Sequence, residues 1–139
     1  MKSIANTDIH IRCCEKDSNG HVSNTSYFYY FEQACTQFLK SIIEQEDEMN
    51  FIVARVECDY FTQAFAVQTL TIKSSLTHIG TKSFTIVHEV YETTSQTLIT
   101  KARVIIVCFD FQQQQSIPIS DALRAELVQY VNVDRAQEV

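Results

Sequence analysis

The fold is decided by residues 24–42, NTSYFYYFEQACTQFLKSI. Apolar side chains recur in this stretch at the spacing of one helix face, and further aromatic residues widen that face. We therefore predict one long helix that starts at Asn24 as its N-cap and ends near the acidic run 44–48. Such a helix is buried over much of its circumference and needs a large apolar partner. The face is made by Phe28, Phe31, Cys35, Phe38, Leu39 and Ile42, widened by Tyr27, Tyr30 and Ala34.

The residues before this helix, DSNGHVS (17–23), form a polar loop that contains an acid, a glycine and a histidine. The first N–H groups of a helix have no carbonyl partner within the helix, so they face such a loop. Asp17 and His21 would then lie beside a set of backbone donors, an arrangement that can polarise a carbonyl and activate water. The competing interpretation is that Asp17 closes a turn before Gly20 and does nothing else.

Outside these residues, most of the remaining chain shows the alternating pattern of β-strands. A short alternating strand precedes the loop at 8–13, and four more follow at 52–60, 70–77, 84–90 and 98–109. Short connections favour an antiparallel sheet. The polar tract 112–115 predicts a turn, and 121–131 predicts a second helix with Ser120 as N-cap. Because only the sheet offers enough apolar surface, it should curl around the long helix in an α+β fold, as a single domain over residues 1–139.

Net charge, cysteine spacing and the lack of long apolar runs exclude several classes of protein. A formal net charge of -6 argues against nucleic acid or an anionic membrane as the main partner. The five cysteines include the neighbours Cys13 and Cys14 and show no paired spacing, so we expect reduced, apolar cysteines rather than disulfides or a zinc site. Residues 1–8 lack the apolar core of a signal peptide, and no apolar run is long enough to span a bilayer. These features predict a cytoplasmic protein without a metal.

The loop and helix together resemble the opening signature of the hotdog-fold acyl-CoA thioesterases, in the branch similar to 4-hydroxybenzoyl-CoA thioesterase. Weaker similarities follow in the expected order at 59–60, 80–84, 108–110 and 117–119, so the resemblance covers about residues 7–130. It implies a hotdog fold, a five-stranded antiparallel sheet wrapped around one long helix with a short C-terminal helix. The signature reads Arg12-x-x-Glu15-x-Asp17-x-x-Gly20-His21-Val22-x-Asn24-x-x-Tyr27, with Phe31-Glu32 after it.

The resemblance also implies an activity, the hydrolysis of an acyl-CoA thioester to a free acid and CoA. Asp17 would act as general base or as nucleophile, with His21 beside it and the backbone N–H at Asn24 on the thioester oxygen. No cofactor is implied, because CoA belongs to the substrate. A basic turn can hold its phosphates. The residues expected to contact substrate are Gly20, Tyr27, Tyr60, Lys82 and Ser83.

Two further expectations concern partners and core residues. By resemblance the protein forms a homodimer or homotetramer with sites at the interface. We predict that His88 is a core histidine whose ring nitrogens have hydrogen-bond partners. We predict that Glu32 is a buried acid paired with Arg12 or with a backbone donor. Two other functions stay open, a non-catalytic acyl-CoA binding protein and a hotdog hydratase or dehydratase.

Overall fold

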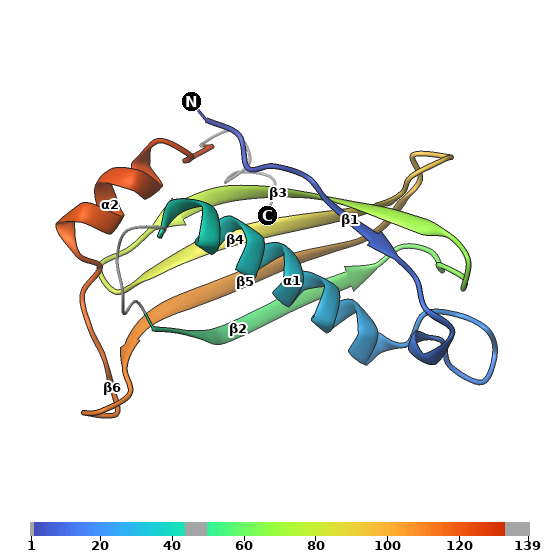
Figure 1. Ribbon diagram of the computed structural model, residues 1–139, viewed down its shortest axis with the longest axis horizontal. Coiled ribbons are helices and arrows are strands. Elements are labelled where there is room, and N and C mark those ends of the chain that lie inside the picture. The colour runs from blue at the N-terminus through green and yellow to red at the C-terminus, as the bar shows by residue number, and fades with distance from the viewer. Residues whose placement is uncertain (1, 44–49, 133–139) are drawn as a thin grey trace.

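The computed structural model describes residues 2–43 and 50–132. Within them one long helix, one short helix and one 3₁₀ turn accompany the strands (Figure 1). In chain order the elements are β1 (Thr7–His10), η1 (Cys13–Glu15), α1 (Asn24–Ile42), β2 (Phe51–Tyr60), β3 (Thr69–Ile79), β4 (Ser83–Glu92), β5 (Leu98–Asp110), β6 (Gln115–Ser116) and α2 (Asp121–Val128).

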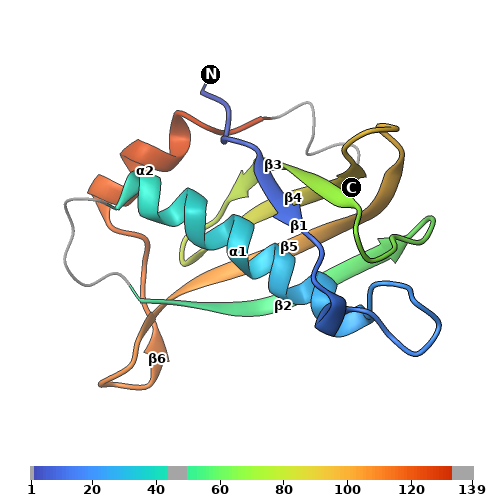
Figure 2. The same cartoon turned by 45° about the vertical axis from the view of Figure 1, so that its right-hand side comes forward.

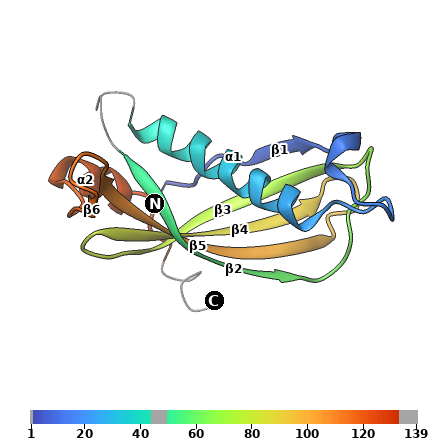
Figure 3. The ribbon, with the colours of Figure 1, turned by 90° about the horizontal axis from the view of Figure 1, so that it is seen from below.

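The five main strands form one antiparallel sheet in the order β1-β3-β4-β5-β2. α1 lies along one face of this sheet, which curves around it, as the view from below shows (Figure 3). The predicted α+β hotdog architecture is therefore confirmed. The turn predicted at 112–115 lies at 111–114 and closes a hairpin, because Gln115 and Ser116 form β6, which pairs with Phe109 and Asp110. A strand of two residues has no periodicity, so the sequence could not indicate it.

The core lies between α1 and the sheet in two clusters along the helix. The cluster at the N-terminal half of α1 includes Tyr27 and Phe31, and the other includes Phe38. One part of the predicted stripe is wrong, because Phe28 is 41% exposed. The sheet contacts the side of α1 that carries residues 27, 30, 31, 34, 35 and 38, so residue 28 is turned away from the core.

Three predicted details of the ends need correction. Ser23, not Asn24, is the N-cap of α1, because its backbone is extended and its carbonyl accepts the N–H of Tyr27; Asn24 is the first helical residue. α2 ends at Val128 rather than 131, although Ser120 caps it as predicted by accepting the N–H of Leu123 at 3.1 Å. The adjacent cysteines at 13 and 14 are exposed on the 3₁₀ turn rather than apolar core residues.

β2 is an edge strand of the sheet, and most of its residues are exposed. Its register against β5 shifts between Val53 and Arg55, which is a bulge. A view turned by 45° shows β2 along the border of the sheet, below α1 (Figure 2). In the part of the chain that is described, no helix has the length and hydropathy needed to cross a membrane.

Candidate functional site

The loop around Asp17 closes on itself through four hydrogen bonds. The N–H of Asp17 donates to the carbonyl of His21 at 2.6 Å, and the N–H of Gly20 donates to the carbonyl of Asp17 at 3.1 Å. Oδ1 of Asp17 accepts the N–H groups of Asn19 at 2.9 Å and His21 at 3.1 Å. Gly20 has φ 85°, which favours glycine. Asp17 thus does close a turn, and its exposed carboxylate is held by two amides.

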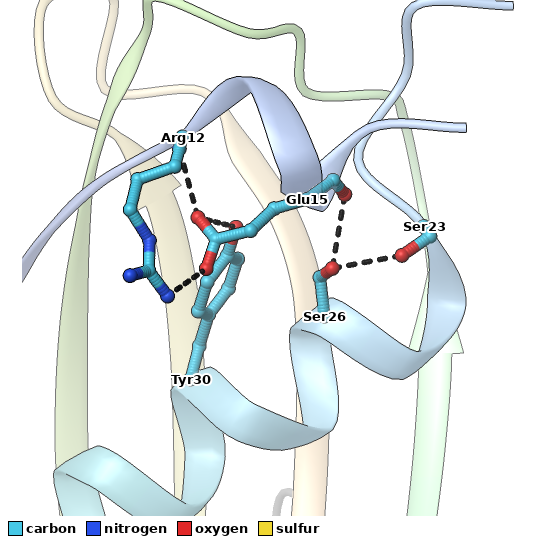
Figure 4. A network of polar contacts seen from close by, with 5 residues as sticks. All are labelled: Arg12, Glu15, Ser23, Ser26 and Tyr30. Carbon is cyan, nitrogen blue, oxygen red and sulfur yellow. Dashed lines mark hydrogen bonds and ion pairs between the residues drawn. The ribbon is translucent and has the colours of Figure 1, made fainter. Parts of the chain in front are cut away.

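Backbone and hydroxyl groups tie this loop to the first turn of α1 (Figure 4). Lys16 and Val22 pair as an isolated antiparallel bridge at the base of the loop. The carbonyl of Glu15 accepts the N–H of Ser23 and the hydroxyl of Ser26, each at 2.9 Å, and the two serine hydroxyls lie 2.8 Å apart. The loop therefore has a defined position at the N-terminal end of the helix.

The side chain of Glu15 makes a second attachment between η1 and α1. Oε1 accepts the N–H of Arg12 at 2.8 Å and the hydroxyl of Tyr30 at 3.2 Å, and Oε2 lies 3.0 Å from Nη2 of Arg12 (Figure 4). Desolvation works to raise the pKa of Glu15, but the hydrogen bonds from Arg12 and Tyr30 outweigh it and the pKa is lowered. Desolvation and the nearby carboxylate of Glu15 raise the pKa of Tyr30.

This arrangement corrects the expected pairing of Arg12 with Glu32. Arg12 bonds to Glu15 instead, because η1 places the two residues three positions apart on one turn, whereas Glu32 is exposed further along α1. Sequence reasoning placed Tyr30 on the buried helix face and Glu15 in the motif, but it proposed no contact between them. The only signal was the place of Glu15 in the motif, because a contact between residues 15 apart across a loop leaves no periodic pattern.

His21 reaches Asp17 through its backbone amide, as described above, while its ring packs edge-on against Phe65 with centroids 4.7 Å apart. A second attachment to the same segment is the N–H of Val22, which donates to the carbonyl of Ala64 at 2.9 Å. The structure thus brings Asp17, Gly20 and His21 together in one turn. It places the His21 ring against the connection between β2 and β3.

The start of α1 contacts the end of β2 through three side chains, Asn24, Tyr27 and Tyr60. The hydroxyl of Tyr60, at the end of β2, donates to Oδ1 of Asn24. The rings of Tyr60 and Tyr27 lie 5.4 Å apart, and burial raises the pKa of both phenols. The backbone N–H of Asn24 belongs to the first turn of α1. The first N–H groups of a helix have no carbonyl partner within the helix, and they form the positive end of its dipole.

Lys82 and Ser83 do not join this group within one chain. Along β5, Tyr60 pairs with Thr100 and Ser83 pairs with Val107. Seven residues of strand separate the two positions, roughly 23 Å at about 3.3 Å per residue. The Lys82 turn lies instead near α2 (Figure 1), and its contact with substrate stays a prediction.

The site offers an exposed carboxylate in a loop that is tied to the positive end of a helix, with aromatic side chains in the first turns of that helix and on neighbouring segments. That combination suits general-base or nucleophilic attack on a carbonyl whose oxygen accepts backbone N–H groups. Among residues 2–43 and 50–132, no three or more His, Cys, Asp or Glu side chains gather where they could hold a metal ion.

Comparison with known proteins gives a consistent result. The profile of a family described as the thioesterase-like superfamily matches residues 11–127. The long-chain acyl-CoA thioesterase FadM of Escherichia coli is 25% identical over 129 residues, covering 90% of this chain and 98% of FadM. The uncharacterized protein YsmA of Bacillus subtilis is 28% identical over 80 residues, which cover 56% of this chain and 54% of YsmA.

A solved structure shows the same fold. It is the structure of a predicted thioesterase from Bacillus stearothermophilus, with a TM-score of 0.84 and 28% sequence identity. The superposition covers 91% of this chain and 96% of that one.

Proposed function

Because the chain belongs to the thioesterase-like superfamily, we propose that it hydrolyses an acyl-CoA thioester to a free carboxylic acid and CoA. The observation that carries the proposal is the exposed carboxylate of Asp17, held by two amides in a loop that is tied to the N-terminal end of α1. The acyl-CoA thioesterase named FadM, similar over nearly its whole length, supports the choice of substrate.

The chemistry follows from these groups. Asp17 takes a proton from water, and the water oxygen attacks the thioester carbon. The resulting oxyanion accepts hydrogen bonds from N–H groups at the start of α1. The tetrahedral intermediate then expels CoA as its thiolate, which takes up a proton. In the nucleophilic alternative the Asp17 carboxylate attacks the carbon itself, the C–S bond breaks and CoA leaves as its thiolate, which takes up a proton. Water then hydrolyses the anhydride between Asp17 and the acyl group, which releases the free acid and restores the carboxylate. In both routes Asp17 supplies an unprotonated oxygen.

The substitution Asp17→Asn tests this role with little disturbance of the loop. The Oδ1 atom of asparagine can still accept the N–H groups of Asn19 and His21, so the turn keeps its hydrogen bonds. We expect kcat for thiol release to fall by about 10²- to 10⁴-fold, with an unchanged thermal unfolding midpoint. Unaltered turnover would mean that Asp17 only closes the turn.

One observation favours a second candidate, an acyl-CoA binding protein without catalysis. Oδ1 of Asp17 is already engaged by two amides, as in a purely structural turn. A panel of acyl-CoA substrates followed by free-thiol release separates the two functions. Binding without thiol release from any substrate would establish the binding protein, and hydration of an enoyl-CoA without thiol release would establish a hydratase.

The proposal includes a homodimer formed through β2. An exposed edge strand has unpaired backbone groups, and pairing with a second copy satisfies them. Antiparallel pairing of two β2 strands reverses their ends, so the partner's Lys82 would lie toward the Asp17 end of this chain. This supports the predicted contact of Lys82 with CoA phosphates. Sedimentation analysis tests it, because a monomer at working concentration would contradict the dimer; the same measurement distinguishes a tetramer.

A further inference from the structure

Two adjacent thiols lie exposed on the 3₁₀ turn η1. They belong to Cys13 and Cys14, and both side chains are accessible from solution. The remaining cysteines are less accessible, because Cys35 and Cys108 are buried and Cys58 is partly buried. All five are free thiols. A thiol-reactive molecule in solution therefore meets the adjacent pair first.

η1 is connected to the Asp17 loop and to α1 through Glu15, its last residue. The Glu15 side chain accepts the hydroxyl of Tyr30 at 3.2 Å. Its carbonyl accepts the N–H of Ser23 and the hydroxyl of Ser26, each at 2.9 Å. Because these contacts fix η1 against both the loop and the helix, a change in the backbone of η1 moves the loop as well.

A disulfide between the two neighbours is incompatible with this turn. Neighbouring Cα atoms are about 3.8 Å apart across a trans peptide, whereas most disulfides join Cα atoms about 4.4–6.8 Å apart. η1 is closed by the N–H of Glu15 on the carbonyl of Arg12 at 2.9 Å and by the N–H of Lys16 on the carbonyl of Cys13 at 3.5 Å. Linking the two sulfurs twists the peptide between Cys13 and Cys14 and shifts these bonds. A disulfide under such strain is also easily reduced, so its formation is reversible.

We propose that Cys13 and Cys14 are a modification site for low-molecular-weight disulfides, which join the two cysteines in a disulfide with each other and thereby displace the Asp17 loop. One cysteine loses its proton to solvent, and its thiolate attacks a sulfur of the reagent. The S–S bond of the reagent breaks, and one thiolate leaves and takes up a proton. The neighbouring cysteine, deprotonated in the same way, attacks the protein sulfur of this mixed disulfide and expels the second thiolate, which also takes up a proton. Two protein thiols are thus oxidised while one reagent disulfide is reduced to two thiols.

The effect of this modification on turnover rests on the proposed function, whereas the modification itself does not. A displacement of roughly 1 Å in a reacting group can lower a rate by about 10²-fold. Oxidation should therefore suppress the proposed hydrolysis, because the Asp17 carboxylate leaves its place beside the start of α1. Reduction of the disulfide should restore it.

The first test identifies the covalent product. The purified, reduced protein is incubated with glutathione disulfide, and its intact mass and peptide map are measured. We expect each chain to lose two hydrogen atoms, with the new bond between Cys13 and Cys14, and dithiothreitol to reverse the change. A protein that only gains glutathione, or chains joined to one another on a non-reducing gel, would overturn the proposal.

A second test separates the disulfide from simple attachment of the reagent. Cys14→Ser leaves one exposed thiol, so this variant should gain one glutathione and keep most of its kcat. The wild-type protein should lose about 10- to 100-fold in kcat on the same treatment. Cys58→Ser is the matched control, because it keeps the adjacent pair and should lose as much as the wild type. An equal loss in Cys14→Ser would overturn the role of the disulfide.

A third test needs no turnover and so stands apart from the proposed function. The N–H groups of Asp17, Gly20 and His21 are hydrogen-bonded within the loop. Oxidation of the wild-type protein should speed their hydrogen exchange by at least about tenfold and leave the exchange in β4 and β5 unchanged. Faster exchange would uphold the displacement even if no acyl-CoA releases thiol. Unchanged exchange in the oxidised protein would overturn it even if the protein is a thioesterase.

Discussion

Two polar clusters lie against α1, and each contains side chains of the kind found in active sites. The loop cluster holds the exposed carboxylate of Asp17 in the loop that precedes the helix. The core cluster lies at mid-helix, where Nε2 of His88 is 3.1 Å from the thiol of Cys35 and Nδ1 is 2.7 Å from the hydroxyl of Ser74. By composition the second cluster resembles a nucleophile, a base and an orienting group.

The two clusters differ in burial, and this difference indicates a structural role for the core cluster. His88 is fully buried and stacks on Phe31 with ring centroids 5.7 Å apart, which confirms the predicted core histidine. Burial lowers the pKa of His88 to about 4 and raises the pKa of Cys35 to about 12. Both groups are therefore neutral near pH 7, and the cluster joins helix to sheet through neutral hydrogen bonds. Distances alone do not identify a site, because a nucleophile must also be able to ionise.

The largest expected difference between the clusters is in activity. Ser74→Ala removes the hydroxyl that bonds Nδ1 of His88, and we expect it to lower the free energy of unfolding by about 1–3 kcal/mol and leave kcat unchanged. Asp17→Asn, in contrast, should lower kcat by about 10²- to 10⁴-fold. Steady-state kinetics and urea unfolding of both variants make the comparison. A loss of kcat in Ser74→Ala that matches that of Asp17→Asn would mean that the core cluster takes part in catalysis.

The second prediction concerns the pH dependence of stability. Between pH 6.5 and pH 4 the unfolded chain protonates His88 while the folded chain does not, so the free energy of unfolding falls as the pH falls. The loss is of the order of 3 kcal/mol. His88→Gln has an amide for the same neighbours but no titrating group, so its unfolding free energy should fall less over this range. Parallel curves for the two proteins would contradict the buried neutral state.

The third prediction concerns the backbone of the Asp17 loop. Gly20 has φ 85°, and a Cβ built there meets no atom within 4 Å, so the cost of Gly20→Ala comes from the backbone alone. We expect a loss of about 1–2 kcal/mol in unfolding free energy, with reduced kcat because Asp17 shares the turn. Gly20→Asn is the control, since asparagine tolerates this conformation better, and it should recover part of both.

The smallest effect is expected at the attachment of the loop to the helix. Tyr30→Phe removes the hydrogen bond to Glu15, and we expect a loss of about 1 kcal/mol in unfolding free energy. The fall in kcat should be far smaller than for Asp17→Asn, because Arg12 still holds the Glu15 side chain. Tyr29→Phe is the matched control, since Tyr29 is 68% exposed. Equal effects of the two substitutions would show that the attachment does not position the loop.

Particular residues show how far the sequence predicted this site. Asp17, Gly20, His21 and Asn24 lie within eight residues, so their proximity follows from chain connectivity and could be predicted. Lys82 and Ser83 were selected because a tight basic turn can hold phosphate, but the strand register places that turn at the opposite end of β5 from Tyr60. Glu15 and Tyr30 were missed because their contact depends on how η1 sits against α1.

The sequence by itself determined the order of helices and strands, the burial of α1 and the loop that precedes it. Helical spacing, strand alternation and turn residues act over a few positions, and the chain carries them in its local pattern. Only the tertiary structure decided that β2 is a free edge, that Cys35 and Ser74 bond to the buried His88 and that a cavity remains between α1 and β2. These features depend on strand order and on side-chain packing between distant segments, which several arrangements of the same elements could satisfy locally.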